Sequence, residues 1–222
     1  MKQLNFKKLF CTALISASIG SNLALAGPRD VQITEVNLET GVVELQNLGT
    51  GTESLNGWRF CSHNTSFVRR YSATPGLNGI SLAPGESLFV HFNNDASASN
   101  EINISTIGGN FANLETEAYG LQIYFPPISF SNGNAIADHL QWSINGVDNT
   151  TADDRSDEAQ NGGVWLDQTQ WISIAEDTDI IRLTDFSNTE LHSPINFALG
   201  AAPDDNTDID ALLPIVLSIL EE

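Results

Sequence analysis

Turn-forming residues interrupt the apolar runs of this chain about every ten residues, and this spacing limits its fold more than any other feature. Short runs rich in Val, Ile, Phe and Trp alternate with clusters of Gly, Asn, Pro and Asp. A sustained apolar period of 3.6 residues, which would indicate a long helix, is missing after residue 26. The pattern therefore predicts an all-β fold, an antiparallel β-sandwich of about 7–9 strands.

The expected strands follow from runs of alternating or continuous apolar residues between turns. In the run 88–92, Leu88, Val90 and Phe92 share one face because side chains alternate along a strand. The segments 93–110, 146–161 and 194–210 are expected to be loops, because they are rich in polar and turn-forming residues. The predicted strands are 31–38, 42–47, 58–62, 66–71, 80–82, 88–92, 121–125, 135–142, 171–174 and 180–183.

The first 26 residues have the order of a secretory signal peptide. Lys2, Lys7 and Lys8 precede an apolar run at 9–19, and Ala24-Leu25-Ala26 provides a small-x-small cleavage pattern. The apolar run is too short and too interrupted for a membrane span, which takes about 20 apolar residues. The sequence therefore predicts cleavage near Ala26 and export to the periplasm or the extracellular space. The expected division is a signal peptide at 1–26, a β-sandwich at 27–190 and a C-terminal tail at 191–222.

Removal of the signal would leave a strongly acidic protein. All three lysines lie within it, so six arginines and 28 acidic residues remain, which gives a net charge of −22. Such a surface repels nucleic acid and anionic membranes, whose binding needs clustered basic groups. Cys61 would be the remaining cysteine, so an internal disulfide is excluded, and its apolar surroundings predict a small buried side chain.

Several short motifs occur in the order typical of a known family. There is an acidic residue in the first strand, a Glu-Leu-x-Asn strand, a Leu-x-Gly-Trp turn, a Pro-Gly turn, an Asp-x-x-x-aromatic strand and a Gly-x-Trp pair. Together these motifs resemble those of the bacterial lamin-tail domains, and the resemblance covers residues 29–186. The matching segments are 33–37, 43–49, 55–58, 82–88, 138–142 and 163–165.

The resemblance implies an immunoglobulin-like sandwich and, in bacteria, an extracellular accessory or interaction module that is sometimes fused to nucleases or other hydrolases. It brings no catalytic residues. Long insertions at 93–120 and 146–161 and the tail depart from the family pattern. The matched residues also have physical roles. Trp58 is expected to anchor the core, Glu44 to face outward, and Gly57 and Gly85 to adopt positive φ.

Calcium is the ligand that the acidic loops fit best, because oxygen-rich loops suit hard cations. The first candidate site consists of Asp153, Asp154 and Asp157, with Asp148 and Glu158 nearby. A second acidic stretch, 204–210, lacks the glycine and the final glutamate of an EF-hand loop. With so many acids in the chain, chance clusters are also expected, so the alternative is that neither stretch binds a specific ion.

Catalytic motifs are missing from the sequence. It contains no Gly-x-Ser-x-Gly elbow, phosphate loop or paired-His zinc helix, and only Cys61-x-His63 has a ligand-like spacing. The remaining histidines, His91, His139 and His192, are widely separated. A pair of glycosidase carboxylates is not excluded by an acid-rich sequence. We nevertheless expect no enzymatic activity.

The sequence analysis thus predicts a secreted, non-catalytic lamin-tail-like module that binds a protein or glycan outside the cell or at its surface. The alternatives are a calcium-dependent glycan-binding module and an accessory to an extracellular hydrolase. A glycan platform could use Tyr124, Trp142, Trp165 and Trp171, although packing in the core is the ordinary role of aromatic residues in strands. The apolar segment 211–220 could pack on the domain or dock a partner.

Overall fold

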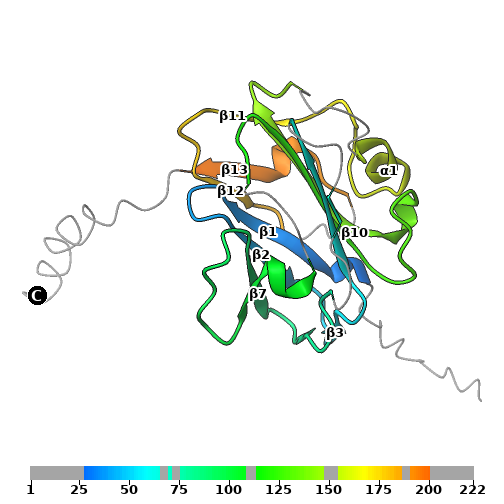
Figure 1. Cartoon of the computed structure of the whole chain (residues 1–222). Coiled ribbons are helices and arrows are strands. Elements are labelled where there is room, and N and C mark those ends of the chain that lie inside the picture. The colour runs from blue at the N-terminus through cyan, green and yellow to red at the C-terminus, as the bar shows by residue number, and fades with distance from the viewer. Residues whose placement is uncertain are drawn as a thin grey trace, which may run out of the picture.

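The computed structural model describes residues 28–65, 70–71, 76–108, 114–147, 155–186 and 191–200. Their strands form two larger sheets that pack face to face as a β-sandwich, together with a small two-stranded sheet (Figure 1). The all-β sandwich predicted from the sequence is therefore confirmed. Eight of the described strands have four residues or more, which matches the expected number of main strands.

The first larger sheet has six strands in the order β13-β12-β1-β2-β7-β8. Its neighbours are antiparallel except β7 and β8, which are parallel. The bulge in β1 between Ile33 and Glu35 shifts the pairing with β2 by one residue. The strands are β1 (Val31–Asn37), β2 (Val42–Asn47), β7 (Ser87–His91), β8 (Glu101–Asn103), β12 (Ile180–Leu183) and β13 (Phe197–Gly200).

The second larger sheet has five strands in the order β11-β10-β9-β4-β5, and its β10–β11 pair is parallel. The two-stranded sheet consists of β3 and β6. The strands are β4 (Arg59–Asn64), β5 (Arg70–Tyr71), β9 (Ala118–Tyr124), β10 (Ile136–Ile144) and β11 (Ile172–Ile174), with β3 (Glu53–Ser54) and β6 (Ser81–Leu82).

Helices connect the strands at several points. The α-helix α1 (Ser156–Asn161) lies beside β10 and next to the 3-10 helix η3 (Gly133–Ala135). The other 3-10 helices are η1 (Pro28–Asp30), η2 (Ile104–Ile107) and η4 (Pro194–Asn196). The sequence predicted a loop at 146–161, and α1 occupies the end of that segment because Ser156 and Ala159 are buried against the sandwich.

Apolar side chains from both larger sheets fill the core between them. Phe60 in β4 contacts Phe92, just after β7, with their ring centroids 6.1 Å apart. Trp58 and Cys61 are buried, as the sequence predicted, and Leu88, Val90 and Phe92 point inward together. Because Phe60 faces the six-stranded sheet, the alternating neighbours Cys61 and His63 face away from it.

Two strands formed where the sequence predicted loops. β8 lies within the Asn-rich segment 93–110 and pairs with β7. β13 lies in the segment that the sequence placed in a C-terminal tail, and it pairs with β12 at the edge of the six-stranded sheet. Both are edge strands without a clear apolar alternation, so tertiary pairing rather than local pattern determines them.

Candidate functional site

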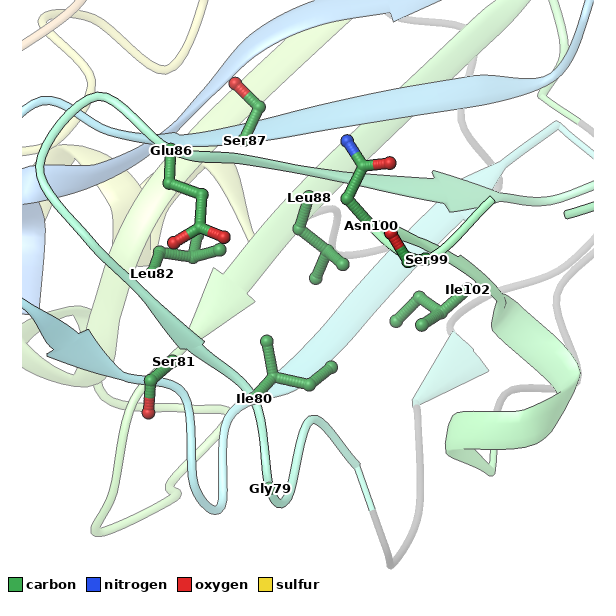
Figure 2. A pocket seen from close by; sticks show the side chains of 10 residues that line it. All are labelled: Gly79, Ile80, Ser81, Leu82, Glu86, Ser87, Leu88, Ser99, Asn100 and Ile102. Atoms are coloured by element: carbon green, nitrogen blue, oxygen red, sulfur yellow. The ribbon is translucent and has the colours of Figure 1, made fainter. Parts of the chain in front are cut away.

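A groove of about 290 Å³ lies where the small β3–β6 sheet meets the edge of the six-stranded sheet (Figure 2). Its walls come from β6 and the residues before it, from the start of β7, and from the segment that leads into β8. Figure 2 shows side chains from these three segments turned toward the same space. The lining residues are Gly79, Ile80, Ser81, Leu82, Glu86, Ser87, Leu88, Ser99, Asn100 and Ile102.

The floor of the groove is apolar. Leu82 and Leu88 are buried, whereas Ile80 and Ile102 are half-buried and expose part of their side chains. The side chain of Leu88 points inward because buried and half-exposed residues alternate along β7. Ile102 in β8 pairs with Val90 of β7. The half-buried side chains of Ile80 and Ile102 beside this apolar floor offer a binding site for an apolar group of a partner.

The rim of the groove is polar and carries a single titratable side chain among its lining residues, Glu86. One carboxylate oxygen of Glu86 accepts a hydrogen bond of 2.8 Å from the backbone N–H of Ala83. The backbone carbonyl of Asn100 accepts a hydrogen bond of 3.0 Å from Phe89. General acid–base catalysis needs a positioned proton donor and acceptor at the reacting group. The lining residues offer binding groups rather than such a pair.

Asn47 holds the turn on which this groove depends. Its side-chain amide donates hydrogen bonds of 2.8 Å to the carbonyls of Gly51 and Leu82, and its Oδ1 accepts one of 2.9 Å from Gly49 N–H. The backbone carbonyl of Asn47 accepts a hydrogen bond from Gly85, whose φ is +76°. The Asn of the Glu-Leu-x-Asn motif therefore joins β2 to β6, and the predicted positive φ of Gly85 is confirmed.

His91 contacts both ends of the loop that leads from β7 into β8. Its Nδ1 bonds to Asp95, and its Nε2 lies 3.6 Å from a carboxylate oxygen of Glu101. Backbone N–H groups of Ser97 and Ala98 donate to Glu101, and these hydrogen bonds lower the pKa of its carboxyl. The two carboxylates lie at opposite nitrogens of one ring, so they do not converge on a common point where an ion could bind.

Of the three residues predicted to bind calcium, Asp157 alone lies within the described ranges. Asp153 and Asp154 lie outside the described residues, as do Asp148 and the stretch 204–210. Asp157 is exposed in the first turn of α1, where a hydrogen bond with the Glu158 side chain lowers its pKa. Glu158 also forms an ion pair with Arg155. Within the described ranges, no three His, Cys, Asp or Glu side chains are placed to hold a metal ion.

Three of the four histidines are buried in the sandwich. His139 accepts a hydrogen bond at Nδ1 from Gln122 (2.9 Å) and donates from Nε2 to Gln141 (2.7 Å). Burial lowers the pKa of His139 to about 4, so this ring is neutral at pH 7. His63 is also fully buried, beside Gly120 of the next strand. The spacing of Cys61 and His63 thus reflects two buried neighbours in β4.

Asp138 connects the two larger sheets. Its Oδ2 accepts a hydrogen bond of 2.8 Å from Ile33 N–H, and its Oδ1 accepts one of 2.8 Å from His139 N–H. The Nδ1 of His192 lies 3.2 Å from the same Oδ1, and both side chains are buried. The bulge in β1 begins at Ile33, so Asp138 pairs with the backbone where the strand register shifts.

The aromatic residues considered for a glycan platform are buried. Tyr124, Trp142 and Trp165 have no exposed surface, and Trp171 is 5 % exposed. The indole N–H of Trp142 donates to the Glu115 carbonyl at 2.8 Å, and that of Trp165 donates to the Gln170 carbonyl at 3.0 Å. Packing in the fold, the alternative that the sequence favoured, is confirmed for these four residues.

The sequence did not indicate the groove. Its floor combines Ile80, Leu82, Leu88 and Ile102, of which only Leu82 and Leu88 share a motif, the Pro-Gly turn 82–88. The Pro-Gly turn before β7 was the one local sequence signal in this region.

Among the described residues, no helix is long and apolar enough to cross a membrane.

Comparisons with known proteins leave the groove as the main guide to function. No protein-family model matches the chain, and no curated protein matches it either.

Proposed function

We propose that this protein is a secreted, non-catalytic interaction module, similar to the bacterial lamin-tail domains, that binds a partner protein at the cell surface or outside the cell. The observation that carries the proposal is the groove with its apolar floor and polar rim. A half-buried Ile80 and Ile102 between hydrogen-bonding groups can accept an apolar side chain of an extended partner segment.

The roles of the buried polar groups support a binding role. Asp138 accepts hydrogen bonds from backbone groups of both sheets, and His139 lies between two glutamines. These groups hold the strands together and are enclosed, so a substrate would have to displace the fold to reach them. A catalytic acid or base must instead lie within hydrogen-bond reach of a substrate.

The residues that carry the lamin-tail resemblance have structural roles in the sandwich. Asn47 holds the turn next to the groove, Trp58 fills the core, and Asp138 joins the sheets. Gly57, in the Leu-x-Gly-Trp turn, has a φ of +81°. The motif residues that suggested the family thus stabilise a sandwich, which supports the proposed relationship.

Export is part of the proposal, because residues 1–26 have the pattern of a signal peptide. The test is the N-terminal sequence of the protein recovered from the periplasm or the culture medium of the bacterial cells that express it. The proposal requires a chain that begins at Gly27 or within a few residues of it. A chain that stays in the cytoplasm with Met1 in place would contradict export.

The groove is tested with a random peptide library displayed on phage and selected on the purified protein. We expect enrichment of peptides with an apolar residue, and the variant Ile102→Lys should weaken their binding about tenfold, which is about 1.4 kcal/mol. Val147→Lys is the matched control, since Val147 is an exposed apolar residue outside the groove lining. Equal loss in both variants, or no loss in either, would argue against the groove.

The non-catalytic character is tested separately. The purified protein is assayed for hydrolysis of nucleic acid, glycans and esters, and any activity is followed in variants at single acidic or histidine residues. Activity that disappears in one such variant would refute the proposal. Calcium-dependent glycan binding stays a prediction, because Asp153 and Asp154 lie outside the described residues; calorimetric titration of calcium with and without substitutions at Asp153, Asp154 and Asp157 tests it.

A further inference from the structure

Exposed apolar side chains gather around the last described segment, 191–200. Five large apolar residues among those described are strongly exposed, and Ile195 (89 %) and Leu199 (44 %) belong to this segment. Leu166 donates its backbone N–H to the His192 carbonyl. Phe186 follows Thr184, which donates two hydrogen bonds to the Asn196 carbonyl. We call Leu166, Phe186, Ile195 and Leu199 the β13 patch.

The position of β13 makes this patch unusual. β13 is one of the two described edge strands of the six-stranded sheet, next to β12 (Figure 1). Leu199 pairs with the fully buried Ile181 of β12, so it lies on the inner side of the sheet yet remains exposed. Single exposed apolar residues are ordinary, but several around one edge strand indicate a contact surface, and open strand edges invite pairing.

The chain itself carries an apolar segment directly after this patch. Residues 211–220 read Ala-Leu-Leu-Pro-Ile-Val-Leu-Ser-Ile-Leu, between an acidic stretch and Glu221-Glu222. Ten residues, 201–210, separate this segment from Gly200 at the end of β13. Fully extended, they reach about 35 Å, whereas five strand residues span about 17 Å. The segment can therefore reach Leu199 and Ile195 from its attachment point at Gly200.

We infer that the apolar segment 211–220 docks on the β13 patch of the same chain. A ten-residue linker makes the contact intramolecular, with an effective concentration in the millimolar range. A second copy of the chain must compete with that concentration and also with the repulsion between two acidic proteins. Docking within one chain is therefore favoured over exchange between copies.

The inference is tested by hydroxyl-radical footprinting of the full chain, which reports the solvent exposure of individual Leu, Ile and Phe side chains. The variant replaces Leu212, Leu213, Val216 and Leu217 by serine. We expect oxidation of Ile195 and Leu199 to become about three times faster or more, as required if the segment is docked most of the time. Val147, exposed outside the β13 patch, is the internal control and should react at the same rate in both proteins.

A reciprocal variant guards against an effect on folding. Ile195→Asp changes a side chain that is already 89 % exposed, and it should speed the oxidation of Leu212 and Leu213 because coupling between two sites is mutual. As a matched control, Asp204→Asn with Asp205→Asn changes the linker and should leave all rates unchanged. Light scattering accompanies each measurement and should give the monomer mass.

Two results would overturn the inference. Equal oxidation of Ile195 and Leu199 in the full chain and the serine variant would show that the segment does not cover the patch. Protection that appears only at concentrations where the mass doubles would assign the patch to a second copy.

Discussion

Outward side chains of β2 and β7 on the six-stranded sheet are more exposed than those of β4, β9 and β10 on the five-stranded sheet. On the six-stranded sheet, Glu44 and Gln46 of β2 and Phe89 and His91 of β7 are half-exposed. The corresponding face of the five-stranded sheet is also rich in polar residues, but these residues have no exposed surface. They are Cys61, His63, Gln122, His139, Gln141 and Ser143.

The difference arises from a covering segment. Residues that follow α1 lie over the five-stranded sheet, where the ring centroid of Trp165 is 5.3 Å from that of His139. The side-chain amide of Gln141 donates to the carbonyls of Gln168 and Gln170. Buried polar groups cost free energy unless they are hydrogen-bonded. The cover supplies acceptors for Gln141, whereas His139 bonds to Gln122 and Gln141 within the sheet. A polar strand face is therefore a poor guide to exposure when another segment can bond to it.

The largest expected effect comes from a carboxylate that lies between the two sheets, in contrast to one on the half-exposed outer face. Asp138→Ala should lower the free energy of unfolding by about 3–5 kcal/mol, because it leaves the Ile33 N–H and His192 without their partner. Urea unfolding followed by circular dichroism measures the loss. Glu44→Ala, on the half-exposed face, should change stability by no more than about 0.5 kcal/mol. Similar losses in both variants would show that the carboxylate between the sheets contributes no more to stability than the one on the half-exposed face.

The second prediction concerns pH. His139 has a pKa of about 4 in the folded protein, against 6.5 for the ordinary side chain. Between these values the unfolded chain binds more protons, so stability decreases as pH falls through this range, by about 3 kcal/mol in total. Other groups titrate there too, so the measurement is the difference in unfolding free energy between the protein and His139→Gln at pH 7 and pH 4.5. Parallel pH profiles would show that this ring does not resist protonation.

A third, smaller effect is expected at Gly120. A methyl group at this position would overlap the imidazole ring of His63 on the neighbouring strand. Gly120→Ala should therefore cost about 1–3 kcal/mol of stability through overpacking. If His63 is the obstacle, the cost should shrink in the double variant with His63→Ala, as a double-mutant cycle would show. Gly200→Ala is the control, because a methyl group there meets nothing within 4 Å.

The smallest loss of stability is expected on the half-exposed outer face of the six-stranded sheet. Both Nε and Nη2 of Arg182 lie 2.7 Å from one carboxylate oxygen of Glu35, and Arg182 is 57 % exposed. Glu35→Gln should cost about 0.2–1 kcal/mol, the range of surface ion pairs. In 1 M salt the Debye length is about 3 Å, so the difference should fall further. A larger, salt-independent loss would place this pair with the buried interactions.

The fold was predictable where local pattern and tertiary environment agree. β2 has the predicted bounds, since Val43, Leu45 and Asn47 alternate with half-exposed residues. β7 has the predicted inner face. By contrast, β8 contains Glu101 and Asn103, and it forms because β7 offers an edge beside it. The six-residue helix α1 is too short for a helical period to be recognised.

The candidate site was less predictable than the fold. Asn47, in the motif that matched the family, does support the turn beside the groove. The floor residue Ile102 belongs to β8, which the sequence treated as loop, so the groove had no place in a prediction without that strand. The acids considered for calcium were selected by composition, and of these only Asp157 and the neighbouring Glu158 lie in the described residues.

The order β13-β12-β1 has a mechanical consequence. Each neighbouring pair is antiparallel, so β1 and β13 run in the same direction, and the start of β1 and the end of β13 lie at opposite ends of the sheet. A force that pulls on the two ends of the domain would slide these strands along one another and load their hydrogen bonds together. Breaking these hydrogen bonds one after another, as when a hairpin is unzipped, would need a force perpendicular to the strands. A domain held at both ends would thus resist tension through these three hydrogen-bonded strands.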